Sequence, residues 1–205
     1  MLITLDYLVE KYKINFKGIL HVGMHEAEEI YAYEKYIGRD KILWVEAMSD
    51  KVEYCISKFP NILAENAIIS DVEEDVKFNI SNNGQSSSIL ELGLHKIKHP
   101  EVHYISSFKS RSKRLDNIIG KYNDKINFNF VNLDIQGAEL KALKSMGNYL
   151  KNIDYIYTEV NDDYVYEKCD LVGDIDNYLI PFGFTRVETR WFGDCKWGDS
   201  FYIKV

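Results

Sequence analysis

The sequence predicts an α/β fold of the doubly wound, Rossmann-like kind, with a mostly parallel seven-stranded sheet and an antiparallel hairpin at its C-terminal end. Two observations predict the parallel part. Short apolar runs alternate with segments of helical periodicity, and these runs are hydrophobic throughout rather than at every second position. A third observation, two strand-like segments close together at the end of the chain, predicts the hairpin.

The first half of the chain supplies two strand–helix units after an amphipathic helix. Leu5, Leu8 and Tyr12 recur at helical spacing, so we expect an N-terminal helix within residues 1–15. The units that follow are a strand at 18–23, a helix at 26–37, a strand at 41–46 that ends in an acid, and a helix that Pro60 ends. Two such units predict a parallel sheet covered by helices on both faces.

The second half continues the sheet. We expect a third strand within 61–70, an added edge strand at 76–80, and strands at 128–134 and 155–159 with acids at their ends. Further expected elements are helices at 140–146 and 174–179 and the hairpin strands at 184–191 and 201–205. Residues 81–88 are loop-like in composition, and residues 81–114 are expected to form an insertion on the substrate side. All of these elements belong to one predicted domain, residues 1–205.

Composition narrows the function classes. The net charge of −7 argues against a broad basic surface for nucleic acid, and we interpret the basic run at 109–114 as a solvated edge or loop. No segment is apolar over the roughly 20 residues that a membrane span requires. Three cysteines without close pairs indicate reduced thiols rather than a disulfide framework or a zinc site. We therefore expect a cytoplasmic protein with no nucleic-acid partner and no membrane span.

Acidic residues follow three of the predicted strands. Glu46, Asp134 and Glu159 stand at the ends of separate strands. The carboxyl ends of parallel strands meet at one edge of the sheet, where ligands bind. Glu46 follows the glycine turn at Gly23 by about 20 residues, the spacing at which an acid accepts hydrogen bonds from a ribose diol. We expect Glu46 to bind ribose.

The turn after the first strand lacks the full glycine pattern of a dinucleotide site. Glu26 and Glu28 place negative charge where a pyrophosphate needs backbone amides, which disfavours NAD. A ligand with a cationic group suits this turn better, and S-adenosylmethionine carries both an ammonium and a sulfonium. An ordinary strand exit explains the segment from His21 to Gly23 equally well.

Several segments, taken in order, resemble the FkbM-type methyltransferases, which have the class I S-adenosylmethionine-dependent fold. The most specific is the run from Asn132 to Leu140, NLDIQGAEL. The others are His21–Glu26, Trp44–Ala47, Asn66–Asp71, Gln85–Ile89, Glu159–Val160 and Trp197–Ser200. The similarity spans most of the chain and implies a methyltransferase with S-adenosylmethionine as its cofactor.

The resemblance also implies a cofactor site. Residues 21–26 would wrap the methionine part of the cofactor, Glu46 would hold its ribose, and the turn at 66–67 would lie against its adenine. The expected contacts, in chain order, are His21, Gly23, Glu26, Glu46, Ala47, Asn66, Ala67, Ser86, Asp134 and Gln136. The family's first turn usually has a second glycine where this chain has Ala27, and we expect a reshaped pocket there.

Methyl transfer to a hydroxyl requires alignment of donor and acceptor and a group that removes the hydroxyl proton. Asp134 is the first candidate, as a general base or as a metal-assisted hydroxyl ligand. As an alternative, Asp134 caps the helix that starts near Gly137. Glu159 is expected to orient the acceptor or to share the base role, and His95 to lean over the acceptor.

No metal is included among the expected ligands. Glu159 and the acids at 162–163 have the oxygen ligands that Mg²⁺ prefers, but acidic loops are common in a chain of this charge. His95, His99 and His103 recur at a helical spacing. Pro100 interrupts the helix that a shared zinc ion would require.

Together these features predict an O-methyltransferase that acts on a hydroxyl of a sugar or glycan. Tyr164, Tyr166, Trp191 and Trp197 are candidates for stacking on a sugar ring. Alternatives are a binding module that kept the fold and lost catalysis, and a methyltransferase with a non-sugar acceptor. A nitrogen acceptor would favour an N-P-P-Y turn after the fourth strand, where this chain has D-I-Q-G. The sequence leaves the oligomeric state open.

Overall fold

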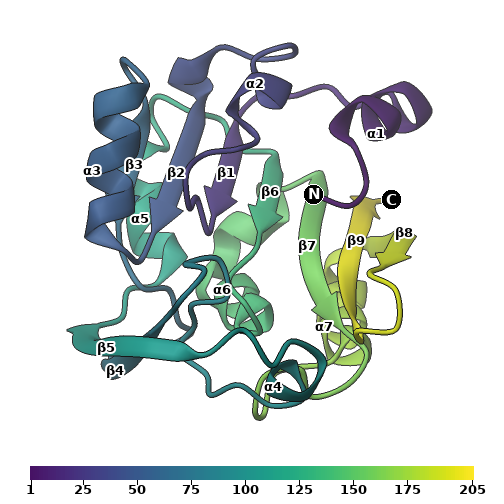
Figure 1. Ribbon diagram of the computed structural model, residues 1–205. Coiled ribbons are helices and arrows are strands. Elements are labelled where there is room, and N and C mark those ends of the chain that lie inside the picture. Colours follow the sequence, from purple (N-terminus) through teal and green to yellow (C-terminus); the bar gives the residue numbers. More distant parts are fainter.

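A computed structural model describes residues 1–205 and shows a seven-stranded sheet between two layers of helices (Figure 1). The strand order is β3-β2-β1-β6-β7-β9-β8. The first five strands are parallel, and β9 is antiparallel to both of its neighbours. The predicted fold class and its C-terminal hairpin are therefore confirmed.

The strands of the main sheet are β1 (Ile19–Val22), β2 (Ile42–Glu46), β3 (Leu63–Asn66), β6 (Phe130–Leu133), β7 (Tyr155–Asn161), β8 (Phe184–Trp191) and β9 (Trp197–Lys204). The α-helices are α1 (Leu5–Tyr12), α2 (Ile30–Tyr33), α3 (Ser49–Lys58), α4 (His95–Lys98), α5 (Leu115–Tyr122), α6 (Glu139–Ser145) and α7 (Val172–Leu179). Short 3₁₀ helices span Arg39–Lys41, Gly147–Asn152 and Ile180–Phe182. No helix has the length and hydrophobicity that crossing a membrane demands.

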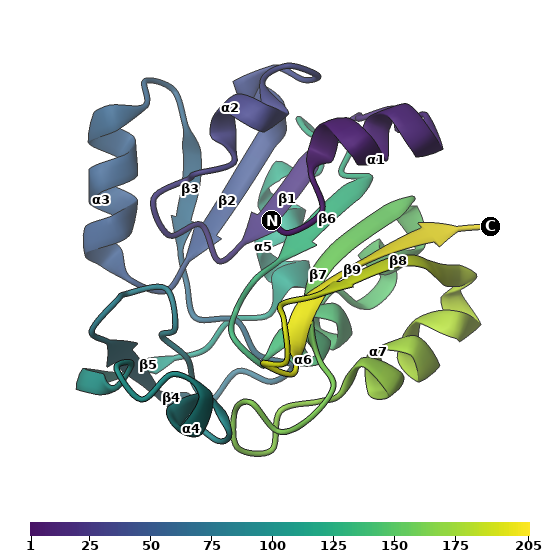
Figure 2. The same cartoon turned by 45° about the vertical axis from the view of Figure 1, so that its right-hand side comes forward.

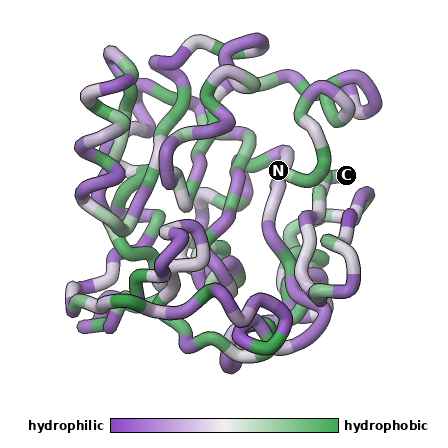
Figure 3. The backbone as a smooth tube through the Cα atoms, in the orientation of Figure 1, coloured by the Kyte–Doolittle hydropathy of each residue, from purple (hydrophilic) through white to green (hydrophobic).

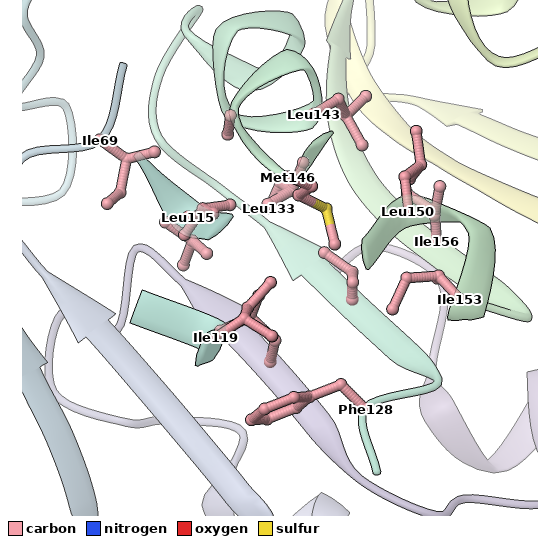
Figure 4. Close-up of a cluster of buried hydrophobic side chains, with 14 of the residues drawn as sticks. Ile69, Leu115, Ile119, Phe128, Leu133, Leu143, Met146, Leu150, Ile153 and Ile156 are labelled. Atoms are coloured by element: carbon pink, nitrogen blue, oxygen red, sulfur yellow. The ribbon is translucent and has the colours of Figure 1, made fainter. Parts of the chain in front are cut away.

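Each face of the sheet carries its own hydrophobic core. Helices α1, α2 and α3 pack on one face and α5, α6 and α7 on the other, as the turned view shows (Figure 2). The tube of α3 alternates between hydrophilic and hydrophobic segments (Figure 3), as expected of a helix with one face on a sheet. On the opposite face, Leu133 of β6 and Ile156 of β7 belong to one buried cluster with Leu115 and Leu143 of the helices (Figure 4).

The helix predicted at 26–37 is much shorter than expected. Only Ile30–Tyr33 is helical, and the preceding residues form turns. His25 and Ala27 have φ angles of 44° and 56°, in the left-handed region that an α-helix excludes. Ala27 adopts this left-handed conformation at the position where the FkbM-type pattern has a glycine.

The segment predicted as an added edge strand does not join the main sheet. It forms β4 (Asp75–Ser81), which pairs antiparallel with β5 (Tyr104–Arg111) in a separate two-stranded sheet. This hairpin and α4 lie beyond the carboxyl ends of β1 and β2 (Figure 1). Alternating polarity identifies a strand but does not identify its partner, so the sequence did not distinguish the two arrangements. Strand β5 and helix α5 were not predicted.

Gly23 marks a close approach of β1 and β6. Its φ angle is 93°, and a Cβ atom at this position would lie 1.8 Å from the backbone oxygen of Asp134. The amide of Gly23 donates to Val45 O at 2.9 Å, while the amide of Asp134 donates to Val22 O at 2.9 Å. The turn after β1 is therefore held between β2 and β6, and only glycine fits there.

We expect Gly23→Ala to lower the free energy of unfolding by about 2 to 4 kcal/mol, because it adds a strained φ angle and a backbone clash. Urea denaturation followed by circular dichroism measures the change. Gly173→Ala in α7 is the matched control: Gly173 is exposed, and no atom lies within 4 Å of its added Cβ. The control should be neutral or stabilising by up to about 1 kcal/mol. Equal stability of Gly23→Ala and the wild type would contradict the close approach.

Candidate active site

A cavity of about 590 Å³ opens at the carboxyl edge of the parallel strands. The exits of β1, β2 and β6 line one side, and the loop after β4, the region of α4 and the β8–β9 turn line the other. This volume lies within the range of small-molecule sites. The cavity wall contains seven carboxylates and no lysine or arginine; the carboxylates are Glu28, Glu29, Glu46, Glu101, Asp134, Glu159 and Asp199.

Glu46, the last residue of β2, is buried in this wall and held by backbone amides. Its two carboxylate oxygens accept hydrogen bonds from the amides of His25 at 2.8 Å and Met48 at 2.9 Å. Burial raises the pKa of Glu46, although the backbone amides oppose the shift. The carboxylate orientation is thus fixed by the first turn and by the exit of β2 itself.

Asp134 and Glu159 are joined by one side-chain amide. The Nε2 of Gln136 donates to Asp134 Oδ1 at 2.6 Å and to Glu159 Oε2 at 2.9 Å. Tyr166 donates its hydroxyl proton to Gln136 Oε1. Ser88 donates to the backbone oxygen of Gln136 at 2.8 Å, which connects this group to the serine-rich loop. No hydrogen bond holds Asp134 Oδ2, and Asp134 is exposed to the cavity that it lines.

The local environment raises the pKa of both carboxyl groups, Asp134 and Glu159, for different reasons. Surrounding protein and the charge of Asp199 raise the pKa of Asp134 to about 6. Glu159 is more deeply buried, and burial together with the charge of Asp134 raises its pKa well above the ordinary value. Asp199 of β9 lies directly opposite Glu159 of β7 in the antiparallel register. Like charges that crowd a dry site keep one partner protonated.

The alternative that Asp134 caps the following helix is wrong. Helix α6 has no side-chain cap, and its N-cap residue is Ala138. Glu139 accepts from two amides of the loop before the helix, Ile135 at 3.0 Å and Gly137 at 3.1 Å. Burial raises the pKa of Glu139 to about 7 in spite of these amides. Asp134 makes no capping hydrogen bond and remains available to the cavity.

The serine-rich loop is held mainly by its own side chains. Ser86 is buried and accepts a hydrogen bond from Asn83 Nδ2 at 3.1 Å, while Ser87 donates to Gly84 O at 2.6 Å. Loop residues 83–87 line the cavity together. The hydroxyls therefore hold the loop in place over the cavity, and Ser86 has limited capacity left for a ligand.

Histidines and aromatic residues form the side of the cavity away from β2. His95 is buried, its Nδ1 has no hydrogen-bond partner, and burial lowers its pKa. His99 lies 3.5 Å from Glu101 between Nδ1 and Oε1. No three His, Cys, Asp or Glu side chains of the chain are arranged to share a metal ion.

The structure places most of the sequence-predicted site residues around this one cavity. Those that line it are His21, Gly23, Glu46, Ala47, Ala67, Ser86, His95, Asp134, Gln136 and Glu159. Glu26 and Asn66 do not line it. Glu26 forms an ion pair with Lys51 at 2.6 Å, and Asn66 donates to the backbone oxygens of Glu46 and Ala47 at 2.9 and 3.0 Å. Both residues hold neighbouring segments rather than face the cavity.

Sequence reasoning gave no role to several residues of the site. Asp199 lies in a segment that carries the FkbM resemblance, which is the one signal that pointed to it. Phe192 in the β8–β9 turn had no such signal. Tyr157 donates its hydroxyl proton to Asp199, a contact across two strands that no local pattern indicates.

Solved structures of similar fold are methyltransferases. The magnesium protoporphyrin IX methyltransferase of Synechocystis PCC 6803, solved with bound S-adenosylmethionine, has a TM-score of 0.52 at 9% identity, over 98% of this chain and 76% of that one. A putative RNA methyltransferase of Pyrococcus horikoshii has a TM-score of 0.52 at 10% identity, over 98% of this chain and 80% of that one. The ribosomal protein L11 methylase of Lactobacillus delbrueckii subsp. bulgaricus has a TM-score of 0.52 at 8% identity, over 98% of this chain and 76% of that one. At these identities the likeness shows a shared fold.

No curated protein matches the sequence. The family model of the methyltransferase FkbM domain does match, over residues 21–187. This range includes Glu46, Asp134 and Glu159 and ends before β9. The protein described here therefore belongs to the FkbM methyltransferase domain family.

Proposed function

We propose that this protein transfers a methyl group from S-adenosylmethionine to a hydroxyl group of a sugar or glycan. The observation that carries the proposal is the Asp134–Gln136–Glu159 group, in which one amide holds two carboxyl groups of different pKa at the cavity. Pairs of this kind provide a proton acceptor and a proton donor at neutral pH. A hydroxyl acceptor needs both, because its oxygen must be oriented and must lose a proton.

The residues of the cavity suit S-adenosylmethionine. Glu46 is an acceptor with a fixed orientation at the end of β2, as a ribose diol requires. Gly23, His21 and Ser86 line the same cavity. Ala67 supplies an apolar contact beside Glu46 for the adenine. The bound cofactor in the Synechocystis structure of the same fold supports this assignment.

When bound, S-adenosylmethionine supplies a methyl carbon that its sulfonium activates for in-line displacement. Asp134 accepts the proton of the acceptor hydroxyl at Oδ2, the oxygen that no residue occupies. The hydrogen bond from Gln136 holds Oδ1 of Asp134 and so fixes the direction in which Oδ2 points. Glu159, whose pKa is raised well above its ordinary value, orients the acceptor oxygen from Oε1, because its Oε2 already accepts from Gln136.

The sugar acceptor and the cytoplasm as the place of action are parts of the proposal. Free Cys55, Cys169 and Cys195 support a reducing compartment. A methyltransferase for a non-sugar small molecule would use the same carboxyl pair, and acceptor profiling distinguishes the two. A binding module without catalysis would bind the cofactor and produce no S-adenosylhomocysteine with any acceptor.

We expect Glu46→Gln to weaken binding of S-adenosylhomocysteine by about 10- to 100-fold, because it removes one acceptor and the charge that face the ribose. Isothermal titration calorimetry at pH 7.5 measures the change. The matched control is Glu65→Gln: Glu65 is half-buried on β3, pairs with Lys121 and does not line the cavity. The control should bind as the wild type does. Absence of binding by the wild type would overturn the cofactor assignment.

We expect the methyl-transfer rate of the wild type to fall as the pH drops below about 6, because Asp134 becomes protonated there. Gln136→Leu should move this acidic limb upward by about one pH unit, since the amide donor lowers the pKa of Asp134 and its loss raises that pKa further. The profile of kcat against pH, measured with tritiated cofactor, gives both values.

Two further variants make this pH profile specific. Asp134→Asn should abolish the acidic limb together with most of the rate. Gln85→Leu makes the same chemical change at another cavity residue that touches neither carboxylate, so it should leave the limb at its original pH whatever its rate. A limb that stays near pH 6 in Gln136→Leu would rule out Asp134 as the base.

A further inference from the structure

The cavity has a second wall, opposite β2, that the cofactor residues do not use. We call it the acceptor wall and define it by His95, His99 and Val102 of the α4 region and by Phe192 and Trp197 of the β8–β9 turn. An ion pair joins the two segments: Lys98 Nζ lies 3.0 Å from Asp194 Oδ2. Two parts of the chain that are distant in sequence are thus held together at the cavity.

Two aromatic rings lie face to face on this wall. The rings of Phe192 and Trp197 are stacked, with centroids 4.7 Å apart and planes at 21°, so each ring keeps one outer face. Both residues line the cavity, and Phe192 is 43% exposed, so part of its ring is accessible to a ligand. A flat aromatic surface packs against the C–H face of a ring-shaped ligand and leaves that ligand's hydroxyls free at its edge.

His95 lies on the same wall with an unused polar atom. It is only 7% exposed, and its Nδ1 has no partner in the protein. This nitrogen is fully buried, whereas Nε2 of the same ring is not and makes no hydrogen bond in the protein, so a ligand reaches the ring at Nε2. Burial lowers the pKa of His95, so at neutral pH the ring has one donor and one acceptor nitrogen. A hydroxyl group, which both donates and accepts, complements either nitrogen.

The charge of the cavity selects against anions. No lysine or arginine lines it. The lysines nearest in sequence to this wall are already paired: Lys96 with Glu167 at 3.7 Å, Lys98 with Asp194, and Lys196 with Asp162 at 3.1 Å. The α-amino group of Met1, which also lines the cavity, lies 3.5 Å from Glu29. A phosphate, sulfate or carboxylate on the acceptor would face carboxylates without a countercharge.

We propose that the acceptor wall binds a saccharide ring that carries no phosphate, sulfate or carboxylate, with one face of the ring on Phe192, which Trp197 supports from behind, and a hydroxyl on His95. The inference rests on the proposed function, because it takes the acceptor to be a saccharide. It adds that the acceptor unit is non-anionic and that the aromatic pair determines its affinity.

The test is binding of the full chain, saturated with S-adenosylhomocysteine, to a printed array of neutral, aminated, phosphorylated, sulfated and uronic-acid saccharides. We expect signals from the neutral or aminated members only. Trp197→Ala and Phe192→Ala should each weaken the signal about 3- to 10-fold. Phe192 is partly exposed, so its variant keeps the test valid if Trp197→Ala does not fold.

Trp191→Ala is the matched control. Trp191 precedes Phe192, is similarly exposed at 39%, and does not line the cavity. This variant should keep the full signal. Comparable binding of acidic saccharides, unchanged binding by both aromatic variants, or no saccharide bound at all would each overturn the inference. Failure of the proposed function has a different signature: the wild type would not bind S-adenosylhomocysteine in calorimetry, so the array would be run on unloaded protein.

Discussion

The close approach of β1 and β6 at Gly23 is the constraint on which the site depends. β1 lies between β2 and β6, and the parallel registers bring Val22 level with Val45 on one side and with Leu133 on the other. The residues that follow these three strands therefore leave the sheet at the same level along the strand direction. Gly23 allows the chain to leave β1 without a side chain that would separate β6 from it. Glu46 and Asp134 consequently face one cavity.

The site concentrates acidic groups that the protein interior opposes. Backbone amides stabilise the carboxylates of Glu46 and Glu139, so no other side chain is needed to hold them. Asp134 and Glu159 receive only the amide of Gln136. Desolvation raises the pKa of both, together with the charge of Asp199 for Asp134 and the charge of Asp134 for Glu159. A raised pKa means that the native state binds these protons more tightly than the unfolded state does. The free energy of unfolding therefore falls as the pH rises towards neutrality. Enzymes accept this cost where the raised pKa serves a reaction.

The segment from β4 to β5 and the C-terminal hairpin supply the cavity walls that the parallel strands do not. The β4–β5 hairpin and α4 lie across the carboxyl edge, and Ser88 ties the loop after β4 to Gln136. The antiparallel β9 brings Asp199 opposite Glu159 and carries Trp197 to the cavity. The carboxyl edge of a widely shared fold is thus joined to cavity walls that loops and the hairpin supply, and such segments commonly carry binding residues.

The sequence by itself determined the order of most elements and the edge of the sheet where the cavity opens. Periodicity reports which residues of a segment are buried, and an acid after an apolar strand marks the carboxyl end, as for Glu46, Asp134 and Glu159. Only the tertiary structure decided that β4 pairs with β5, that Asp134 does not cap α6, and that Asn66 does not line the cavity. The physical reason is that strand partners, caps and cavity walls depend on contacts between residues distant along the chain. Hydrophobic periodicity records only the local environment of each segment.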